Sequence, residues 1–296
     1  MATITETDKA NSTQTQQQDS WTLVIRPKRR WLEINLKELW HYRDLYVMYI
    51  KRDFITLYKQ TILGPLWFLI QPLMTTLVYM FVFGGLAGLS TDGVPQPLFY
   101  MSGVMLWGFF SSSFLLCTNV FVSNAALFGK VYFPRLIVPL ATVTSNMIKM
   151  GIQLLLFVAM YIVYWLIGAP LQVNAALLLF PVLMVMLAFH AVSWGLIVSS
   201  LTSKYRDLSL LVGFVVQLFM YATPVVYPLS AMPDKYKPLM ELNPLTSIFE
   251  AFKYGCMGCG ALDWGGLLYS FVFMVAGLFF SVIIFNRVER NFMDTV

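Results

Sequence analysis

The feature that most constrains the fold of this chain is a series of six long apolar runs. They cover residues 62–89, 97–124, 137–167, 174–202, 208–228 and 264–286. Each run reaches the roughly 20 residues that an α-helix needs to cross the hydrocarbon core of a bilayer. Only 12% of the 296 residues are charged, whereas soluble domains carry about 25%. The sequence therefore predicts an all-α membrane protein with about six transmembrane helices.

Lysine and arginine recur in alternate loops, and this pattern predicts how the chain is oriented. The segment 26–59 is strongly basic, and bases return in the 125–136 loop, in the 203–207 turn and after the sixth run. The 90–96 loop and the 168–173 turn contain no base. Because loops with an excess of bases stay in the cytoplasm, we expect both termini to be cytoplasmic.

The long segment 229–263, between the fifth and sixth runs, must then lie outside. Its three bases and four acids balance, so it does not conflict with this orientation. Three prolines interrupt it, and residues 247–254 have a helical pattern that is too short to span. We predict re-entrant external helices here, which are tolerated at membrane depth only where they are buried in protein or line a cavity.

Three regions are expected along the chain: a disordered cytoplasmic tail and basic segment at 1–30, an interfacial helix region at 31–60 and a transmembrane domain at 61–290. The first twenty residues are polar and lack the apolar core of a signal peptide. Asn35 suits the N-cap of a helix whose Leu36, Leu39 and Trp40 share one face. This pattern predicts an N-terminal amphipathic interfacial helix, with an ordinary soluble amphipathic helix as the alternative.

The third apolar run contains a stripe of polar side chains. Thr142, Asn146, Lys149 and Gln153 recur at helical spacing and share one face. A lysine inside a span is costly, and by default it indicates a functional role. The alternatives are a snorkelling lysine or a polar seam between helices. In every case the stripe must face protein or water and not lipid.

The first and fifth runs combine polar and aromatic side chains on one face. These are Trp67, Gln71, Thr75 and Tyr79 in the first run, and Ser209, Gln217 and Tyr221 in the fifth. Such faces suit a path for a sugar-bearing substrate, because aromatic rings stack on sugar C–H faces while polar edges form hydrogen bonds. Gly64 and Gly213 at the same spacing equally suit ordinary helix–helix packing.

Two short basic turns also contain aromatic residues. The first includes Lys130, Tyr132, Phe133 and Arg135, and the second includes Tyr205 and Arg206. They are either topology determinants with interfacial anchors or surfaces that dock onto a cytoplasmic partner, since aromatic residues and arginine are enriched at interface hot spots.

Several other functions find no support in the sequence. Cys256 and Cys259 form a CxxC without further ligands nearby, so we expect small residues in a packed turn and no metal site. His190 is expected to make a satisfied polar contact within the fourth span. There is no nucleophile–base pair and no P-loop, and no basic stripe on a soluble fold that would bind nucleic acid. We predict no catalytic residue and no cofactor in this chain.

Five stretches, in order, carry a family resemblance. Residues 52–72 read RDFITLYKQTILGPLWFLIQP. The later stretches are Phe133-Pro134-Arg135 with Pro139, Tyr205-Arg206-Asp207, Thr223-Pro224 through Tyr227-Pro228, and Leu242-Asn243-Pro244-Leu245. Over residues 30–290 the chain resembles ABC-2 type permeases that export polysaccharides and polyol phosphates, such as O-antigen, capsule and teichoic acid. Leu57 departs from the pattern, since many members carry a base there.

The resemblance implies a homodimer joined to two copies of an ABC ATPase, which binds the ATP and Mg²⁺, in a bacterial plasma (inner) membrane. The 130–135 turn would be a coupling helix, the 229–263 segment an outer gate, and the first and fifth spans the wall of a path between subunits. The implied substrate is a polysaccharide, foremost O-antigen, on polyprenyl diphosphate. At the membrane entrance Lys51, Arg52 and Lys59 would attract the diphosphate.

Two other functions stay open at this point. One is an ABC-2 permease for teichoic acid, capsule, a drug or a lipid. The other is a membrane-embedded glycosyl or acyl transferase, which would need clustered acids or a His–acid pair at one membrane face, and the sequence contains neither.

Overall fold

A computed structural model describes residues 36–59, 62–205 and 207–295, and the regular structure within these ranges is entirely helical. The predicted tail at 1–30, the Asn35 cap and Arg206 lie outside the described residues. The longer helices are α3 (Arg43–Tyr58), α4 (Trp67–Tyr79), α5 (Gln96–Thr118), α8 (Ile137–Leu166), α9 (Phe180–Thr202), α10 (Leu208–Phe219), α12 (Pro244–Met257) and α13 (Trp264–Thr295).

Shorter helical pieces connect or extend them. They are α2 (Leu36–His41), η1 (Gly64–Leu66), η2 (Met80–Leu86), α6 (Val120–Ser123), α7 (Ala125–Phe128), η3 (Ala175–Leu179), η4 (Met220–Ala222), η5 (Leu229–Ala231) and α11 (Lys237–Glu241). The predicted interfacial helix therefore consists of two pieces, α2 and α3. In α2 and the residue after it, Leu39 and Tyr42 pack against the core, while Trp40 is 70% exposed.

Five of the six predicted spans are confirmed as helical segments long and apolar enough to cross a membrane. They are Gly64–Leu86, Gln96–Thr118, Ile137–Leu166, Ala175–Thr202 and Trp264–Val288. Four of these segments agree with the predicted bounds to within three residues, and the second ends at Thr118, six residues earlier than predicted. The agreement is expected because a segment surrounded by hydrocarbon must satisfy its backbone hydrogen bonds internally.

The fifth predicted span is shorter than expected. Its apolar helix runs only over Leu208–Ala222, which at 1.5 Å per residue is about 22 Å. The helix stops before Pro224 and Pro228, which interrupt the end of the predicted run, and the five spans with this shorter helix agree with about six transmembrane helices. Thr223 is extended, with φ −126° and ψ 142°, because the residue before a proline is disfavoured in helical geometry.

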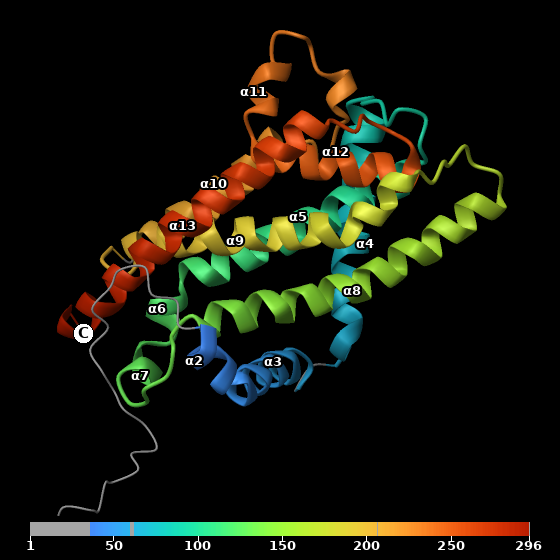
Figure 1. Cartoon of the computed structure of the whole chain (residues 1–296). Helices are drawn as coiled ribbons and strands as arrows, with labels where there is room; N and C mark the ends of the chain where they lie inside the picture. Colours follow the sequence, from blue (N-terminus) through green and yellow to red (C-terminus); the bar gives the residue numbers. More distant parts are fainter. Residues whose placement is uncertain (1–35, 60–61, 206, 296) are drawn as a thin grey trace, which may run out of the picture. The chain divides into compact units, whose positions relative to one another are not determined.

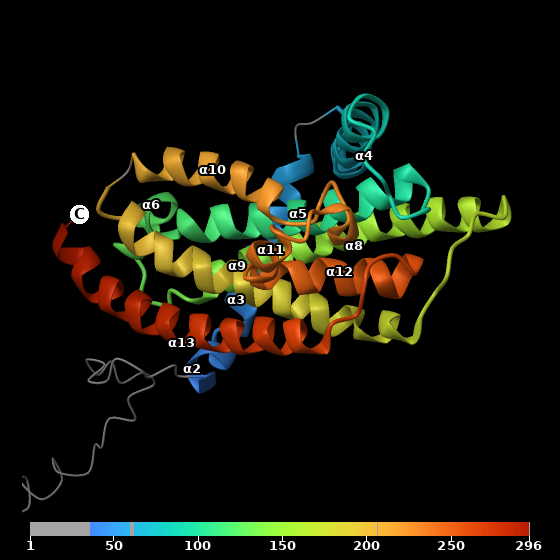
Figure 2. The same cartoon turned by 90° about the horizontal axis from the view of Figure 1, so that it is seen from above.

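Helix α9 lies at the centre of the bundle. It packs along α5 on one side and α13 on the other, and α5 also packs along α8. Figures 1 and 2 show these four helices running beside one another. Gly195 of α9 makes the close approach to α5 possible, because a Cβ there would overlap Cys117. Helix α4 crosses the bundle steeply and contacts α5 and α8 (Figure 1).

The connecting segments gather at opposite ends of the bundle. Figure 1 shows α6, α7 and the C-terminal end of α13 at one end, and α11 and α12 at the other. The predicted short helices of the 229–263 segment are therefore present. Twelve of the 14 residues of α12 are buried, which fits a short helix enclosed by protein.

Candidate functional site

Two cavities lie along α8 and share the same polar side chains. One, of about 210 Å³, lies between α4, α5 and α8, and we call it the α4–α8 cavity. The other, of about 550 Å³, lies between α3, the α5–α6 region and α8, and we call it the α3–α8 cavity. Asn146 and Lys149 line both. The polar stripe of α8 therefore links the two cavities.

The stripe is held in place by hydrogen bonds inside the protein. The Lys149 amine donates to Asn146 Oδ1 at 2.8 Å, and Asn146 Nδ2 donates to Ser113 Oγ of α5 at 3.1 Å. This chain of bonds orients the amide and keeps the amine at the junction of the cavities. The expected common face is confirmed, since Gln153 lines the α4–α8 cavity and Thr142 the α3–α8 cavity.

The polar face of the first span meets this stripe. Gln71, Thr75 and Tyr79 line the α4–α8 cavity opposite Lys149. The Tyr79 hydroxyl donates to the sulfur of Met220 at 3.2 Å, so it is also fixed against the end of α10. Trp67 does not line this cavity and is 49% exposed.

The predicted face of the fifth span does not join the two cavities. Ser209, Gln217 and Tyr221 line neither of them, and the last two are exposed on the surface of the single chain. Helix α10 contacts the bundle instead through Phe219, whose ring packs against Trp107 and Trp194 at 6.1 and 5.8 Å between ring centroids. The first and fifth faces therefore do not form one wall within a single chain.

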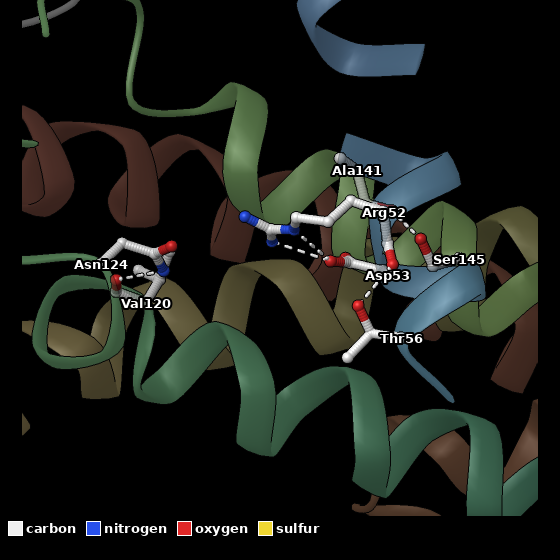
Figure 3. A network of polar contacts seen from close by, with 7 residues as sticks. All are labelled: Arg52, Asp53, Thr56, Val120, Asn124, Ala141 and Ser145. Carbon is white, nitrogen blue, oxygen red and sulfur yellow. Dashed lines mark hydrogen bonds and ion pairs between the residues drawn. The ribbon is translucent and has the colours of Figure 1, made fainter. Parts of the chain in front are cut away.

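The α3–α8 cavity contains the charged pair Arg52 and Asp53 (Figure 3). Arg52 donates to Asp53 Oδ1 from Nη2 at 2.7 Å and from Nε at 3.1 Å, and its guanidinium carbon lies 4.3 Å from the centre of the Tyr49 ring. Thr56, Asn124 and the α8 hydroxyls complete the polar lining. Of the other predicted entrance bases, Lys51 and Lys59 are exposed and do not line the cavity.

An exposed ion pair such as Arg52–Asp53 contributes little to stability. The Arg52 side chain is 53% exposed, so an incoming anion can reach its guanidinium. The α3–α8 cavity is lined by two cations, Arg52 and Lys149, by the carboxylate of Asp53 and by several hydroxyl and amide groups, so its formal charge is positive. This is the chemistry that binds phosphate oxygens.

The 130–135 turn divides into buried and exposed residues. Phe133 is 5% exposed and packs against Tyr49 of α3 and Phe128 of α7, at 6.2 and 5.8 Å between ring centroids. Arg135 lies over the Phe128 ring at 5.3 Å. Lys130 and Tyr132 are exposed. The turn is thus anchored by Phe133 and presents Tyr132 to its surroundings.

The 203–207 turn presents a second aromatic residue. Tyr205 is half exposed, and the amine of Lys204 lies 5.1 Å from the centre of its ring. Arg206, predicted as part of the same surface, lies outside the described residues.

The broken end of α10 is held by three side chains, each bonded to one backbone carbonyl. Tyr227 donates to the carbonyl of Tyr221 at 2.6 Å, and Asn243 donates to that of Ala222 at 2.9 Å. Lys253 of α12 donates to the carbonyl of Pro224 at 2.6 Å. A continuing helix would otherwise have paired the carbonyls of Tyr221 and Ala222. It could not have paired that of Pro224, because the residue four positions on is Pro228, which has no N–H. The three bonds allow a short helix to end inside the protein.

Sequence reasoning missed this network. Lys253 is 1% exposed and its amine lies 3.9 Å from the centre of the Phe99 ring. Glu250, one turn earlier, is also buried, and its Oε1 has no hydrogen-bond partner among the described residues. Burial raises the pKa of the Glu250 carboxyl, and the charge of Lys253 opposes that shift. The signal was an acid and a base three residues apart in an otherwise apolar helix.

The remaining candidates are structural. His190 of α9 forms the expected polar contact within the bundle, a hydrogen bond between Nε2 and Ser270 Oγ of α13 at 3.1 Å. The contact satisfies only one ring nitrogen, since Nδ1 is buried without a hydrogen-bond partner among the described residues. Cys256 and Cys259 are buried free thiols on either side of Gly258, whose φ of 73° ends α12. This is the packed turn that the sequence predicted, since glycine adopts left-handed geometry at little cost.

Comparison with known proteins gives a consistent result. A family model described as ABC-2 type transporter matches residues 45–257. A protein from Klebsiella pneumoniae named O-antigen export system permease protein RfbA is 25% identical over 254 residues, which cover 85% of this chain and 94% of the relative. A protein of the same name from Myxococcus xanthus is 27% identical over 223 residues, 74% and 82% of the two chains. Escherichia coli polysialic acid transport protein KpsM is 21% identical over 248 residues, 82% and 93%.

Proposed function

Since this chain belongs to the ABC-2 type transporter family, we propose that it is the permease subunit of an ATP-driven exporter of a lipid-linked polysaccharide, most closely of O-antigen type. The chain is a multi-pass membrane protein and a transport subunit. It carries no catalytic residue and no cofactor in this proposal. ATP and Mg²⁺ bind to a partner ABC ATPase. Two copies of this ATPase associate with two copies of this chain.

The observation that carries the proposal is the pair of polar cavities along α8, the α4–α8 cavity and the α3–α8 cavity. Lys149 lies where the two cavities meet, in a protein with five apolar helices long enough to span a membrane. The Arg52–Asp53 pair lines the α3–α8 cavity. Intramembrane charge is costly and is kept where a pathway needs it. The relatives named as O-antigen export permeases supply the substrate class.

In this proposal the α3–α8 cavity receives the phosphate groups of the lipid carrier. Arg52 and Lys149 supply the positive charge, while Thr142, Ser145 and Asn124 can bond to the oxygens. Lys51 and Lys59 raise the local positive potential at the surface. The glycan continues past Gln71, Thr75 and Tyr79, whose side chains line the α4–α8 cavity.

A second copy of the chain completes the path. A partner subunit can face a polar–aromatic surface of this chain, which is formed by the exposed side chains of Trp67, Gln217 and Tyr221. Ser209 lies on the same predicted face. The path between subunits would then combine α4 and α10 of each copy.

Coupling to the ATPase uses the basic turns. Lys130, Tyr132 and Tyr205 are exposed and supply the contact surface, while Phe133 and Arg135 hold the 130–135 turn against α3 and α7. Both turns would face the cytoplasm together with the two termini, in the bacterial inner membrane. Arg206 belongs to the same proposed surface.

One experiment tests the proposal. We expect an ABC ATPase to co-purify with the tagged protein. Deletion of the gene that encodes this permease should make an undecaprenyl-type lipid-linked glycan accumulate inside the cell. Accumulation of a different lipid would favour a drug or lipid permease. Chemical activity of the protein purified alone, without an ATPase, would favour a glycosyl or acyl transferase.

A further inference from the structure

A series of ring contacts leads from the 130–135 turn to Arg52. Phe133 of the turn packs against Phe128 of α7 and Tyr49 of α3, at 5.8 and 6.2 Å between ring centroids. The guanidinium carbon of Arg52 lies 4.3 Å from the centre of the Tyr49 ring, and Arg52 lines the α3–α8 cavity. Tyr49 therefore contacts both the basic turn and a cation of the cavity.

The sequence of α3 places these side chains on one face. Tyr46, Tyr49 and Arg52 are three residues apart, and residues at this spacing are neighbours on a helix surface. The hydroxyl groups of Tyr46 and Thr144 of α8 form a hydrogen bond of 2.6 Å. This bond holds the face against α8, so that Tyr49 meets Phe133 and Arg52 lies in the cavity beside α8.

The rings in this series are buried, whereas the cation at its end is not. Tyr49 is 4% exposed, and Phe128 and Phe133 are also buried. In a close-packed interior a ring cannot shift without displacing its neighbours. The Arg52 side chain is 53% exposed, so few contacts fix its position. The face of the Tyr49 ring, which attracts a guanidinium, is one of those contacts.

The ion pair with Asp53 cannot transmit a movement of the turn. Asp53 follows Arg52 directly in α3 and moves with the same helix, although it accepts two hydrogen bonds from the guanidinium. The position of the Tyr49 ring, in contrast, depends on Phe133, which belongs to the turn. Of these two partners of Arg52, only Tyr49 joins the guanidinium to a residue of the turn.

We propose that Tyr49 is a positioning residue that links the 130–135 turn to Arg52, so that displacement of the turn by the ATPase changes how tightly Arg52 binds a phosphate group. This role rests on the proposed function, because it takes the turn as the ATPase contact and the α3–α8 cavity as the diphosphate site. Coupling between two binding sites is reciprocal. A phosphate group that fixes Arg52 therefore also favours one position of the turn.

The test measures phosphate binding in two nucleotide states. The complete permease–ATPase complex in nanodiscs is titrated with undecaprenyl diphosphate, first without nucleotide and then with ATP bound to a hydrolysis-deficient ATPase. In the wild type the two dissociation constants should differ at least about five-fold. Tyr49→Leu keeps an apolar side chain against Phe133 but removes the aromatic face. Its two dissociation constants should differ less than about two-fold, because contact with the guanidinium is lost.

Two tyrosine variants separate this role from general packing. Tyr49→Phe preserves the ring and should retain the nucleotide dependence. Tyr46→Leu is the matched control, since it removes a tyrosine one turn earlier on the same face together with its bond to Thr144. It leaves the contact between Tyr49 and Arg52 in place, so it should also retain the nucleotide dependence. A loosened α3 would instead reduce that dependence in both leucine variants.

Phe133→Leu interrupts the same series of contacts from the side of the turn, and it serves if Tyr49→Leu does not assemble with the ATPase. Where both single variants assemble, the double variant should lose no more nucleotide dependence than either alone, because the two residues act in series. Phe133→Leu should leave undecaprenyl diphosphate bound equally in both states.

Three results would overturn the role of Tyr49 alone. They are full nucleotide dependence in Tyr49→Leu or in Phe133→Leu, an equal loss of it in Tyr46→Leu, and equal dissociation constants of the wild type in the two states. In each of them undecaprenyl diphosphate still binds, so the proposed headgroup site stands. A wild-type complex that does not bind undecaprenyl diphosphate at all would instead contradict the headgroup site, and the role of Tyr49 with it.

Discussion

The amine of Lys253 donates a 2.6 Å hydrogen bond to the carbonyl oxygen of Pro224, across 29 residues of sequence. Pro224 stands just beyond the end of the fifth apolar helix, and Lys253 lies in α12. The bond therefore joins the broken end of a membrane helix to the short enclosed helix of the external segment. Any movement of the end of α10 must either carry α12 with it or break this bond.

Substitution Lys253→Met should destabilise the protein by roughly 1–3 kcal/mol, because the Pro224 carbonyl would stay buried without a donor. The contact of the amine with the Phe99 ring would be lost as well. Thermal unfolding of the detergent-purified protein measures the effect. Lys237→Met is the control, since Lys237 forms only a surface pair with Asp234, and such pairs contribute little. Equal melting temperatures for both variants would contradict the role assigned to Lys253.

Substitution Glu250→Gln should flatten the dependence of stability on external pH. Burial raises the pKa of the Glu250 carboxyl in the folded protein. A raised carboxyl pKa contributes stability that is present below the unfolded pKa and is lost as pH rises through the folded pKa. The melting temperature of the variant relative to the wild type should therefore increase from acidic to neutral pH. Glu241→Gln, at an exposed position, is the control variant measured over the same range.

The two cations of the α3–α8 cavity should act on the same ligand. We expect Lys149→Met and Arg52→Ala each to raise, about ten-fold, the concentration of lipid-linked glycan that half-maximally stimulates the ATPase. Because both would meet one phosphate group, the double variant should lose less than the product of the single losses. Lys235→Met, an exposed base at the opposite end, is the control. Unchanged export and stimulation in Arg52→Ala and in Lys59→Ala would rule out the proposed headgroup site.

Two neighbouring aromatic residues should have different effects when removed. Phe133→Ala should cost about 3–5 kcal/mol of stability because Phe133 is buried between α3 and α7. Tyr132→Ala should leave the melting temperature unchanged and lower the yield of co-purified ATPase. The control is Tyr236→Ala, another half-exposed tyrosine in the external segment. Full ATPase recovery with Tyr132→Ala would show that this residue does not form the contact.

The sequence alone determined where the apolar helices lie. Four of the six long apolar runs became helices with nearly the predicted ends, while the second and fifth ended about six residues early. A helix in hydrocarbon depends on the composition of its own segment, because it must pair its backbone groups internally. The polar stripe through Asn146 and Lys149 was also predictable, because helical spacing places such residues on one face. The end of the fifth helix at Ala222 also agrees with the sequence, because Pro224 follows two residues later.

Only the tertiary structure decided which faces meet. Gln71 and Tyr79 face Lys149, whereas Gln217 and Tyr221 remain on the surface of the single chain. Phe133 is buried although its neighbour Tyr132 is exposed. The bond from Lys253 to Pro224 joins residues that no periodicity connects. Helix formation depends on residues three and four apart, but the pairing of faces depends on packing between helices distant in sequence.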